Sequence, residues 1–258
     1  MAVTISIFNQ KGGVGKSTTA SNLMAGLQLK KKKVLGIDID PQGNLTKLCG
    51  VNTEDENTVL ELLAGDATFI QTVKPTAFGD LLPSDRNLAG YERQFVADVS
   101  NVYAMKDIIE KNCTAYDFII IDCPPNAGMI TMSALIASNY AIVPSEAEYF
   151  SLDGVNEIAK TVDSAKKRLN PNLQVLGVLL IKYQPRRILT RKIESTMQRL
   201  AEQYLHCGLF ETKIGYSVAI PESQAARQSI FEYDAKSKIA KAYLSFAEEV
   251  VTGVKKNG

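Results

Sequence analysis

The chain has 258 residues with a formal net charge of +1, and 45% of its residues are hydrophobic and 22% charged. This composition is typical of a folded globular protein and excludes a chain that is disordered throughout. A net charge near zero also excludes attraction to nucleic acid through overall charge alone, so any such binding must use a local patch.

Short apolar runs alternate with longer amphipathic segments along the chain. In chain order we expect strand 3–8, helix 17–29, strand 34–37, strand 118–121, helix 127–137, strand 140–143, helix 152–169, strand 176–181, helix 189–204 and helix 236–254. Near-continuous apolar runs are typical of strands that are covered on both faces. The sequence therefore predicts an α/β fold, a mostly parallel twisted sheet with helices on both faces, built as a single domain over residues 1–258.

A glycine-rich segment joins the first expected strand to the first expected helix. Residues 9–19 read N-Q-K-G-G-V-G-K-S-T-T. They match the phosphate-binding pattern G-x-x-x-x-G-K-[ST] except at its first position, which is Gln10, and they contain an additional lysine at Lys11. Such glycines let backbone amides approach phosphate oxygens, and the helix N-terminus adds positive charge. The pattern predicts a P-loop NTPase rather than an empty strand-to-helix turn.

The residues of this loop can be assigned roles from the pattern. We expect Lys16 to reach the β- and γ-phosphates of a bound nucleotide, Ser17 to hold Mg²⁺ and Thr18 to contact the α-phosphate. The complete set of expected cofactor-binding residues is Lys11, Gly12, Gly13, Val14, Gly15, Lys16, Ser17 and Thr18.

Two further segments carry carboxylates at the ends of expected strands. Residues 37–44 read I-D-I-D-P-Q-G-N and contain Asp38 and Asp40. Residues 118–125 read F-I-I-I-D-C-P-P, a pattern that delivers Asp122 from a buried strand to a magnesium site. Ligands bind at the carboxyl ends of parallel strands, which favours a site over an Asp-Pro turn in which Asp38 caps a helix.

Together these segments resemble the deviant Walker A motif and the switch I motif of the ParA/MinD family of P-loop ATPases. The resemblance implies that Lys11 reaches across a dimer interface to phosphates bound by the second subunit. It also implies that Asp40 orients the attacking water, so Lys11, Lys16 and Asp40 are the expected catalytic residues. Asp38 is expected near the magnesium shell, which makes Ser17, Asp38 and Asp122 the expected metal residues.

Other segments favour the ParA/Soj branch of this family. Residues 82–90 read L-P-S-D-R-N-L-A-G and residues 143–154 read V-P-S-E-A-E-Y-F-S-L-D-G, and both resemble segments of that branch. Residues 214–220 depart from it, because two arginines and a proline of the family pattern are absent there. One strand precedes the phosphate loop, so we expect no N-terminal helix-turn-helix extension.

Residues 182–199 form the most basic segment of the chain. They hold six Lys or Arg residues against one acid, Glu194. Such a segment is either a solvated helix face or a local patch for DNA phosphates. The position of the Arg186–Arg187 pair in the family pattern implies the second, and we expect Arg186, Arg187 and Arg191 to bind DNA.

The resemblance predicts a slow, partner-stimulated Mg-ATPase whose ATP-bound homodimer binds duplex DNA without sequence preference. A ParB-type centromere-binding protein is the expected partner, in plasmid or chromosome partition. We expect the protein to be cytoplasmic, nucleoid-associated when ATP-bound and without stable membrane association. The alternative is a MinD-like membrane regulator, which would need an exposed amphipathic C-terminal helix, whereas we expect residues 236–254 to pack on the core.

Two other functions are known among ATPases with this kind of loop and remain as alternatives. An iron–sulfur ATPase would need cysteines placed for a shared cluster, and the four cysteines contain no C-x-x-C pair. They are expected to be free thiols rather than zinc ligands, with Cys123 a packed side chain rather than a nucleophile. A small-molecule ligase such as dethiobiotin synthetase shares the loop style, but the segments at 83–90 and 144–154 argue against it.

Overall fold

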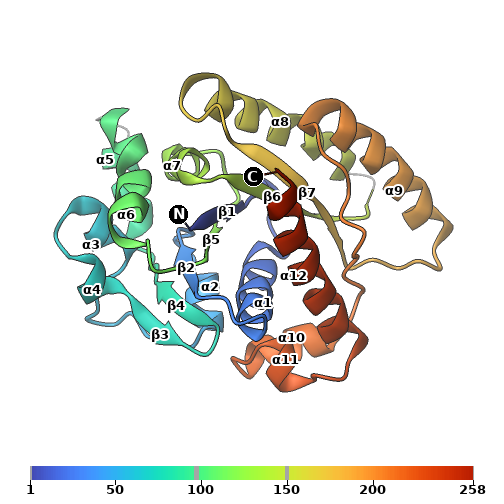
Figure 1. Cartoon of the computed structure of the whole chain (residues 1–258), viewed down its shortest axis with the longest axis horizontal. Helices are drawn as coiled ribbons and strands as arrows, with labels where there is room; N and C mark the ends of the chain where they lie inside the picture. The colour runs from blue at the N-terminus through green and yellow to red at the C-terminus, as the bar shows by residue number, and fades with distance from the viewer. Residues whose placement is uncertain (1, 96–98, 149–150, 258) are drawn as a thin grey trace.

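The computed structural model describes residues 2–95, 99–148 and 151–257, so Tyr149 and Phe150 of the motif at 143–154 lie outside the described residues. Its sheet has seven strands in the order β3-β4-β2-β5-β1-β6-β7 (Figure 1). The strands are β1 Val3–Ile7, β2 Val34–Asp38, β3 Lys74–Thr76, β4 Gly79–Leu82, β5 Phe118–Asp122, β6 Tyr140–Glu146 and β7 Gln174–Ile181. All neighbouring pairs are parallel except β3 with β4. The predicted mostly parallel sheet is confirmed.

Helices connect these strands. The longer ones are α1 Lys16–Leu29, α5 Leu88–Phe95, α6 Ala104–Asn112, α7 Met129–Ala137, α8 Ser151–Arg168, α9 Ile188–Leu200 and α12 Lys238–Asn257. The shorter ones are α2 Asn44–Leu48, α3 Val59–Ala64, α4 Phe69–Thr72, the 3₁₀-helix η1 Val99–Tyr103, the π-helical turn η2 Ala201–Leu205, α10 Ala219–Ala225 and α11 Ile230–Tyr233. The five predicted helices are present, but the one expected over 189–204 changes to a π-helical turn at Ala201.

Alternate residues of the central strands pack against opposite helical layers. In β5, Ile119 and Ile121 join the apolar cluster that contains α6, α7 and α8, whereas Ile120 joins the cluster that contains α1 and α12. All three side chains are fully buried. A strand covered on both faces must be apolar at every position, which is why β5 reads F-I-I-I before its terminal acid. The predicted helices on both faces are therefore confirmed.

The edge hairpin of β3 and β4 was not predicted. Pro75 lies in β3, where proline is tolerated because β3 is an edge strand. Gly79 begins β4 with φ +116°, and a Cβ there would lie 2.7 Å from the carbonyl oxygen of Val34. Both the backbone angle and the close approach require glycine at this position. The hairpin thus depends on contact with β2, which a local sequence pattern does not reveal.

The C-terminal helix α12 packs along α1, as Figure 1 shows. Tyr243, Phe246 and Val250 are buried in this interface, and the Phe246 ring meets the Phe210 ring edge-on at a centroid distance of 5.0 Å. The two helices approach closely at Gly26, where a Cβ would lie 3.0 Å from the Cβ of Ala247. The expectation that residues 236–254 pack on the core is confirmed. Within the described residues, no helix combines the length and apolarity needed to cross a bilayer.

We predict that Phe246→Ala lowers the free energy of unfolding by about 3–5 kcal/mol, because it removes a fully buried ring and leaves a cavity. Urea denaturation followed by circular dichroism measures the change. Ser245→Ala, at an exposed position of the same helix, serves as the control and should change stability by less than about 0.5 kcal/mol. Equal effects of the two substitutions would contradict the packing described for α12.

Candidate functional site

The carboxyl ends of three parallel strands bring the expected site residues together. Asp122 at the end of β5 lies beside Ile7 of β1 on one side and beside Asp38 of β2 on the other. The glycine-rich loop follows β1 directly and leads into α1. The two separate carboxylate motifs of the sequence and the phosphate-loop motif therefore meet at one edge of the sheet.

The loop before α1 has the geometry of an anion cradle. Gly13 and Gly15 have φ values of +75° and +67°, which turn the backbone so that successive amides can face one point. A Cβ on Gly12 or Gly13 would meet nothing within 4 Å, so this side of the loop opens into space. Gly15 instead packs tightly, because a Cβ there would lie 2.8 Å from Cδ1 of Ile181.

Lys16 lies at the start of α1 with only 7% of its surface exposed. Its Nζ donates to the carbonyl oxygen of Lys11 at 3.2 Å, which folds the lysine back over the loop. Burial lowers the pKa of Lys16, while the nearby groups of Asp122, Cys123 and Asp40 partly oppose this effect. A buried cation above open backbone amides is a strong site for negatively charged oxygens.

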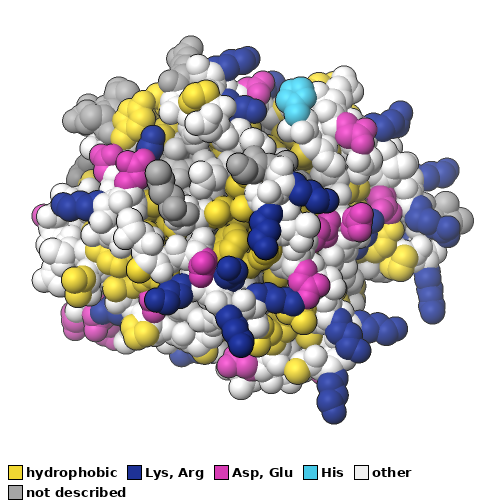
Figure 2. Space-filling model, viewed as in Figure 1, with side chains coloured by type: hydrophobic (Ala, Val, Ile, Leu, Met, Phe, Trp, Pro, Cys, Tyr) yellow, Lys and Arg dark blue, Asp and Glu magenta, His cyan; other side chains and the backbone are white. Residues whose placement is uncertain are grey.

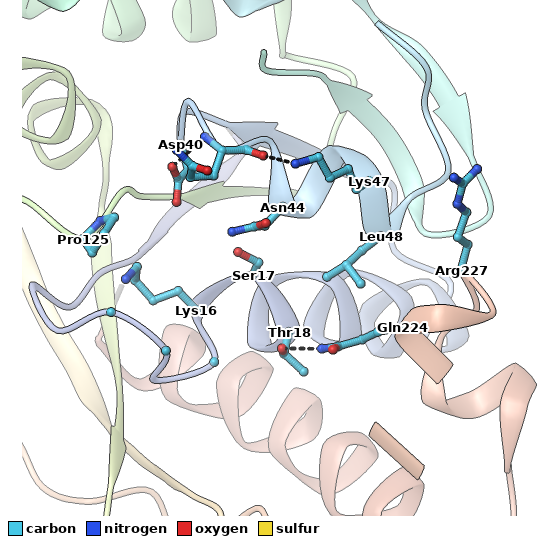
Figure 3. Close-up of a pocket in the computed structure, with 14 residues that line it drawn as sticks. Lys16, Ser17, Thr18, Asp40, Asn44, Lys47, Leu48, Pro125, Gln224 and Arg227 are labelled. Atoms are coloured by element: carbon cyan, nitrogen blue, oxygen red, sulfur yellow. Dashed lines mark hydrogen bonds between the residues drawn. The ribbon is translucent and has the colours of Figure 1, made fainter. Parts of the chain in front are cut away.

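The loop borders a cavity of about 460 Å³ (Figure 3). Figure 3 shows Lys16 and Ser17 on one wall, with Asp40 and Asn44 facing them from the other. The lining residues are Gly12, Gly13, Gly15, Lys16, Ser17, Thr18, Asp40, Gln42, Asn44, Lys47, Leu48, Pro125, Gln224 and Arg227. Most of the expected phosphate-binding residues thus face one cavity, and Val14 is buried behind them.

Asp38 and Asp122 are both fully buried, but their surroundings differ. Oδ1 of Asp38 accepts from the Asp40 amide at 3.1 Å, and Oδ2 accepts from the amide and the hydroxyl of Thr46. Neither carboxylate oxygen of Asp122 has a hydrogen-bond partner of standard geometry. Buried polar atoms are normally paired. The carboxylate of Asp122 is therefore suited to bind a cation or a hydrogen-bond donor from a ligand.

The pKa values of these carboxyls follow their surroundings. Burial raises the pKa of Asp38 to about 6, although hydrogen bonds from Thr46 and Asp40 lower it. Burial, and then the neighbouring Asp38, raise the pKa of Asp122 well above its usual range, and the Ser17 hydroxyl and the Lys16 ammonium only partly offset this. A positive charge between the carboxylates would relieve both effects.

Asp40 lies in the loop between β2 and α2 and faces the cavity (Figure 3). Its Oδ1 accepts from the Gln42 amide at 2.9 Å, and its carbonyl oxygen accepts from the Gly43 amide at 2.8 Å. Only 6% of the residue is exposed. The turn thus holds one carboxylate oxygen and leaves the other available to the cavity.

The structure adds residues that no local pattern indicated. Gln224 of α10 donates its side-chain amide to Oγ1 of Thr18 at 2.7 Å, although 206 positions separate the two in sequence. Both also line a second cavity of about 310 Å³, which therefore adjoins the first. Its other lining residues are Gly13, Gly15, Ile181, Lys182, Ile214, Gly215, Tyr216, Ser217, Ile220, Pro221 and Tyr243. The segment 214–220, which departs from the family pattern, forms much of this wall.

Lys11 differs from the rest of the loop because its side chain is 41% exposed and pairs with Glu148 at 3.6 Å. An Asx turn, in which the Lys11 amide donates to Oδ1 of Asn9 at 2.9 Å, sets its backbone. Among the described residues, those that line the 460 Å³ cavity do not include Lys11. The structure therefore leaves the Lys11 side chain exposed to solvent and outside the lining of this cavity.

The three expected DNA-binding arginines are all exposed, at the start of α9 and in the loop before it. Figure 2 shows Lys and Arg side chains projecting from the side of the molecule that carries α9 in Figure 1. The acid of this segment, Glu194, is bound by the Tyr183 hydroxyl and by Lys213, with its Oε1 2.9 Å from Lys213 Nζ. These contacts neutralise Glu194 and leave the positive charge of the arginines exposed.

The cysteines are free thiols. Burial raises the pKa of Cys113 to about 12, and burial together with Asp122 raises the pKa of Cys123 still further. Thiols with such pKa values stay protonated near neutral pH, which suits packed side chains rather than nucleophiles. Within the described part of the chain, no group of three or more His, Cys, Asp or Glu side chains is placed to hold a metal ion.

Comparison with known proteins identifies relatives along nearly the whole chain. A family model described as an AAA domain matches residues 2–175. The sporulation initiation inhibitor protein Soj of Bacillus subtilis is 38% identical, and the alignment covers 97% of this chain and 98% of Soj. The chromosome partitioning protein ParA of Myxococcus xanthus is 32% identical, over 96% of this chain and 87% of its own.

Solved structures share the whole fold. Cobyrinic acid a,c-diamide synthase from Mycobacterium smegmatis, with bound ADP and magnesium, has a TM-score of 0.86 and 30% identity, covering 100% of this chain and 97% of its own. The septum site-determining protein MinD from Pyrococcus horikoshii, complexed with Mg-ADP, has a TM-score of 0.80 and 28% identity, covering 100% of this chain and 99% of its own. Taken with the site geometry and the sequence relatives, these matches show that the chain belongs to the ParA/Soj branch of the ParA/MinD family of deviant Walker A P-loop ATPases.

Proposed function

We propose that this protein hydrolyses ATP with Mg²⁺ and uses the reaction as a switch in DNA partition. The observation that carries the proposal is the pair of unpartnered, fully buried oxygens of Asp122 beside an open glycine cradle. The cradle fits phosphate oxygens, and Asp122 with Ser17 fits a magnesium ion. Mg²⁺ is held in proteins by one or two carboxylates together with substrate phosphates, which matches a site with few acidic side chains of its own.

Within this proposal the residues of the cavity have distinct roles in binding and hydrolysis. The amides of Gly12, Gly13 and Gly15 and the ammonium of Lys16 bind the phosphates. Bound Mg²⁺ would neutralise charge on the phosphate oxygens. Asp40, which the turn at Gln42 and Gly43 holds with one oxygen free, orients the attacking water.

The second cavity is suited to the base of the nucleotide. It adjoins the phosphate cavity along Thr18 and Gln224, and Ile220, Pro221 and Tyr216 supply flat or apolar surface around it. A nucleotide with its phosphates at the loop can therefore place its base against Tyr216. The proposal thus assigns contact with the base to the segment 214–220, where the sequence departs from the family pattern.

The proposed dimerisation and DNA binding depend on side chains that are exposed on the surface. Residues 1–258 act as one deviant Walker A domain, in which exposed Lys11 reaches the phosphates of a second subunit and makes the dimer depend on ATP. The dimer presents two copies of the patch at Arg186, Arg187 and Arg191 to duplex DNA without sequence preference. A ParB-type partner stimulates slow hydrolysis, and the protein is cytoplasmic and nucleoid-associated in its ATP-bound state. We favour partition over a MinD-like role because α12 packs its apolar face on α1.

We predict that Asp40→Ala lowers kcat for ATP hydrolysis by about 10²–10⁴-fold, because Asp40 supplies the one carboxylate among the described residues that line the cavity. ATP binding should change by less than about 3-fold, since Asp40 does not belong to the phosphate cradle. Phosphate release and fluorescent-nucleotide titration measure the two quantities. Asp66→Ala removes an exposed carboxylate elsewhere and should leave both unchanged. Normal hydrolysis by the Asp40 variant would reject its assigned role.

For the base site, we predict that Tyr216→Ala weakens ATP binding by about 5- to 100-fold, the range expected when a base loses an aromatic stacking partner. Binding of inorganic tripolyphosphate, which has no base, should not change. Competition titrations against a fluorescent nucleotide measure both affinities. Tyr204→Ala, at another partly exposed tyrosine, is the control. An equal loss of tripolyphosphate binding would show that Tyr216 does not act through the base.

For the DNA patch, we predict that the double substitution Arg186→Ala and Arg187→Ala weakens ATP-dependent binding to unrelated duplex DNA at least about 10-fold. The slope of log affinity against log salt should fall by about 2 for each bound protomer, because two phosphate contacts are lost. Filter binding over a salt series measures this. Lys255→Ala with Lys256→Ala removes the same charge from the exposed end of α12 and is the control. Equal effects of the two pairs would indicate a general charge effect and not a patch.

A further inference from the structure

Thr46, in the first turn of α2, makes contacts that none of the motifs above explains. Its Oγ1 donates to Oδ2 of Asp38 at 2.7 Å, and its backbone amide donates to the same oxygen at 2.8 Å. Its Oγ1 also accepts from the Ser84 amide at 2.9 Å. The residue is 2% exposed, so water does not compete for these bonds.

These bonds join three segments of the fold. Asp38 ends β2, Thr46 belongs to α2, and Ser84 lies in the segment that follows β4. The same region is tightly packed, because a Cβ on Gly43, with φ +59°, would lie 3.0 Å from the Ser84 carbonyl oxygen. The hydroxyl of Thr46 is thus the central atom of a clamp, defined here as Asp38, Thr46 and Ser84.

The clamp holds Asp38, which is the neighbour of Asp122. Asp38 lies directly beside Asp122 in the parallel pairing of β2 and β5. Two buried carboxylates side by side repel each other, so the position of each depends on what holds it. No hydrogen bond of standard geometry holds the oxygens of Asp122, whereas the Thr46 hydroxyl and amide hold Asp38 Oδ2 from the side of α2. Without the hydroxyl, Asp38 would lose one of its three hydrogen bonds and Ser84 would lose its acceptor.

We infer that Thr46 is a positioning residue that fixes Asp38 next to the magnesium site and thereby sets the affinity of that site for Mg²⁺. The inference rests on the proposed function, because it concerns the same cation site. Thr46 acts through Asp38, because it is not among the described residues that line the 460 Å³ cavity. Loss of an outer partner of a metal site typically costs about 10–100-fold in metal affinity or activity.

The test uses the full chain with Thr46→Val, which removes the hydroxyl at nearly constant shape, and Thr46→Ser, which keeps it. Thr72→Val is the matched control, because Thr72 is also fully buried but its hydroxyl bonds only the carbonyl of Thr68. Binding of a fluorescent ADP analogue is titrated with Mg²⁺ and also measured in EDTA. Amide hydrogen exchange at Ser84 is measured without nucleotide or metal, and thermal melting reports stability.

We expect Thr46→Val to raise the Mg²⁺ concentration at half-saturation about 10-fold or more, to speed exchange at the Ser84 amide, and to leave binding in EDTA within about 2-fold. Thr46→Ser and Thr72→Val should keep the Mg²⁺ requirement of the wild type. An unchanged Mg²⁺ requirement in Thr46→Val, or the same shift in Thr46→Ser or Thr72→Val, would overturn the inference. Failure of the wild-type protein to bind nucleotide would instead reject the proposed function itself.

Discussion

The pairing of β2 with β5 places two buried carboxylates side by side, and the site is built around that constraint. Burying adjacent like charges is costly unless other groups compensate them. Hydrogen bonds compensate Asp38, and the buried ammonium of Lys16 lies close enough to oppose part of the remaining charge. What is left uncompensated, the two oxygens of Asp122, is also what makes the site able to take up a cation.

The C-terminal quarter of the chain completes a site whose motifs all lie before residue 126. Gln224 binds Thr18, and the amide of Ile230 donates to Oδ1 of Asn22 on the same helix at 3.0 Å. The apolar face of α12 then packs along α1. Helix α1 is therefore held along its length by residues more than 200 positions away, and its N-terminus is fixed relative to the strands. A phosphate site at a helix N-terminus depends on that rigidity.

Prediction from the sequence was most reliable where burial on both faces makes a strand continuously apolar. The strands β1, β2, β5, β6 and β7 follow that rule, and all five were predicted, as were the five helices expected from their amphipathic pattern. The edge hairpin and the helices between Asn44 and Asn112 were not predicted, because each of these elements is at most nine residues long and too short to give a decisive sequence pattern. Pro75 in β3 argues locally against a strand, and only the edge position permits it.

The sequence by itself determined the chemistry of the site: a glycine loop with Lys16 and Ser17, and acids at the ends of two apolar strands. These residues were identifiable because phosphate binding requires small residues and a lysine at fixed local spacing. Only the tertiary structure decided that Asp38 is held by Thr46 while no hydrogen bond of standard geometry holds Asp122, that Lys11 is exposed to solvent, and that Tyr216 and Gln224 border the site. Most of these depend on contacts between segments that are distant in the chain. The Asp38–Thr46 contact spans only eight positions, but it depends on how α2 folds back onto the end of β2. A linear pattern carries no signal for either.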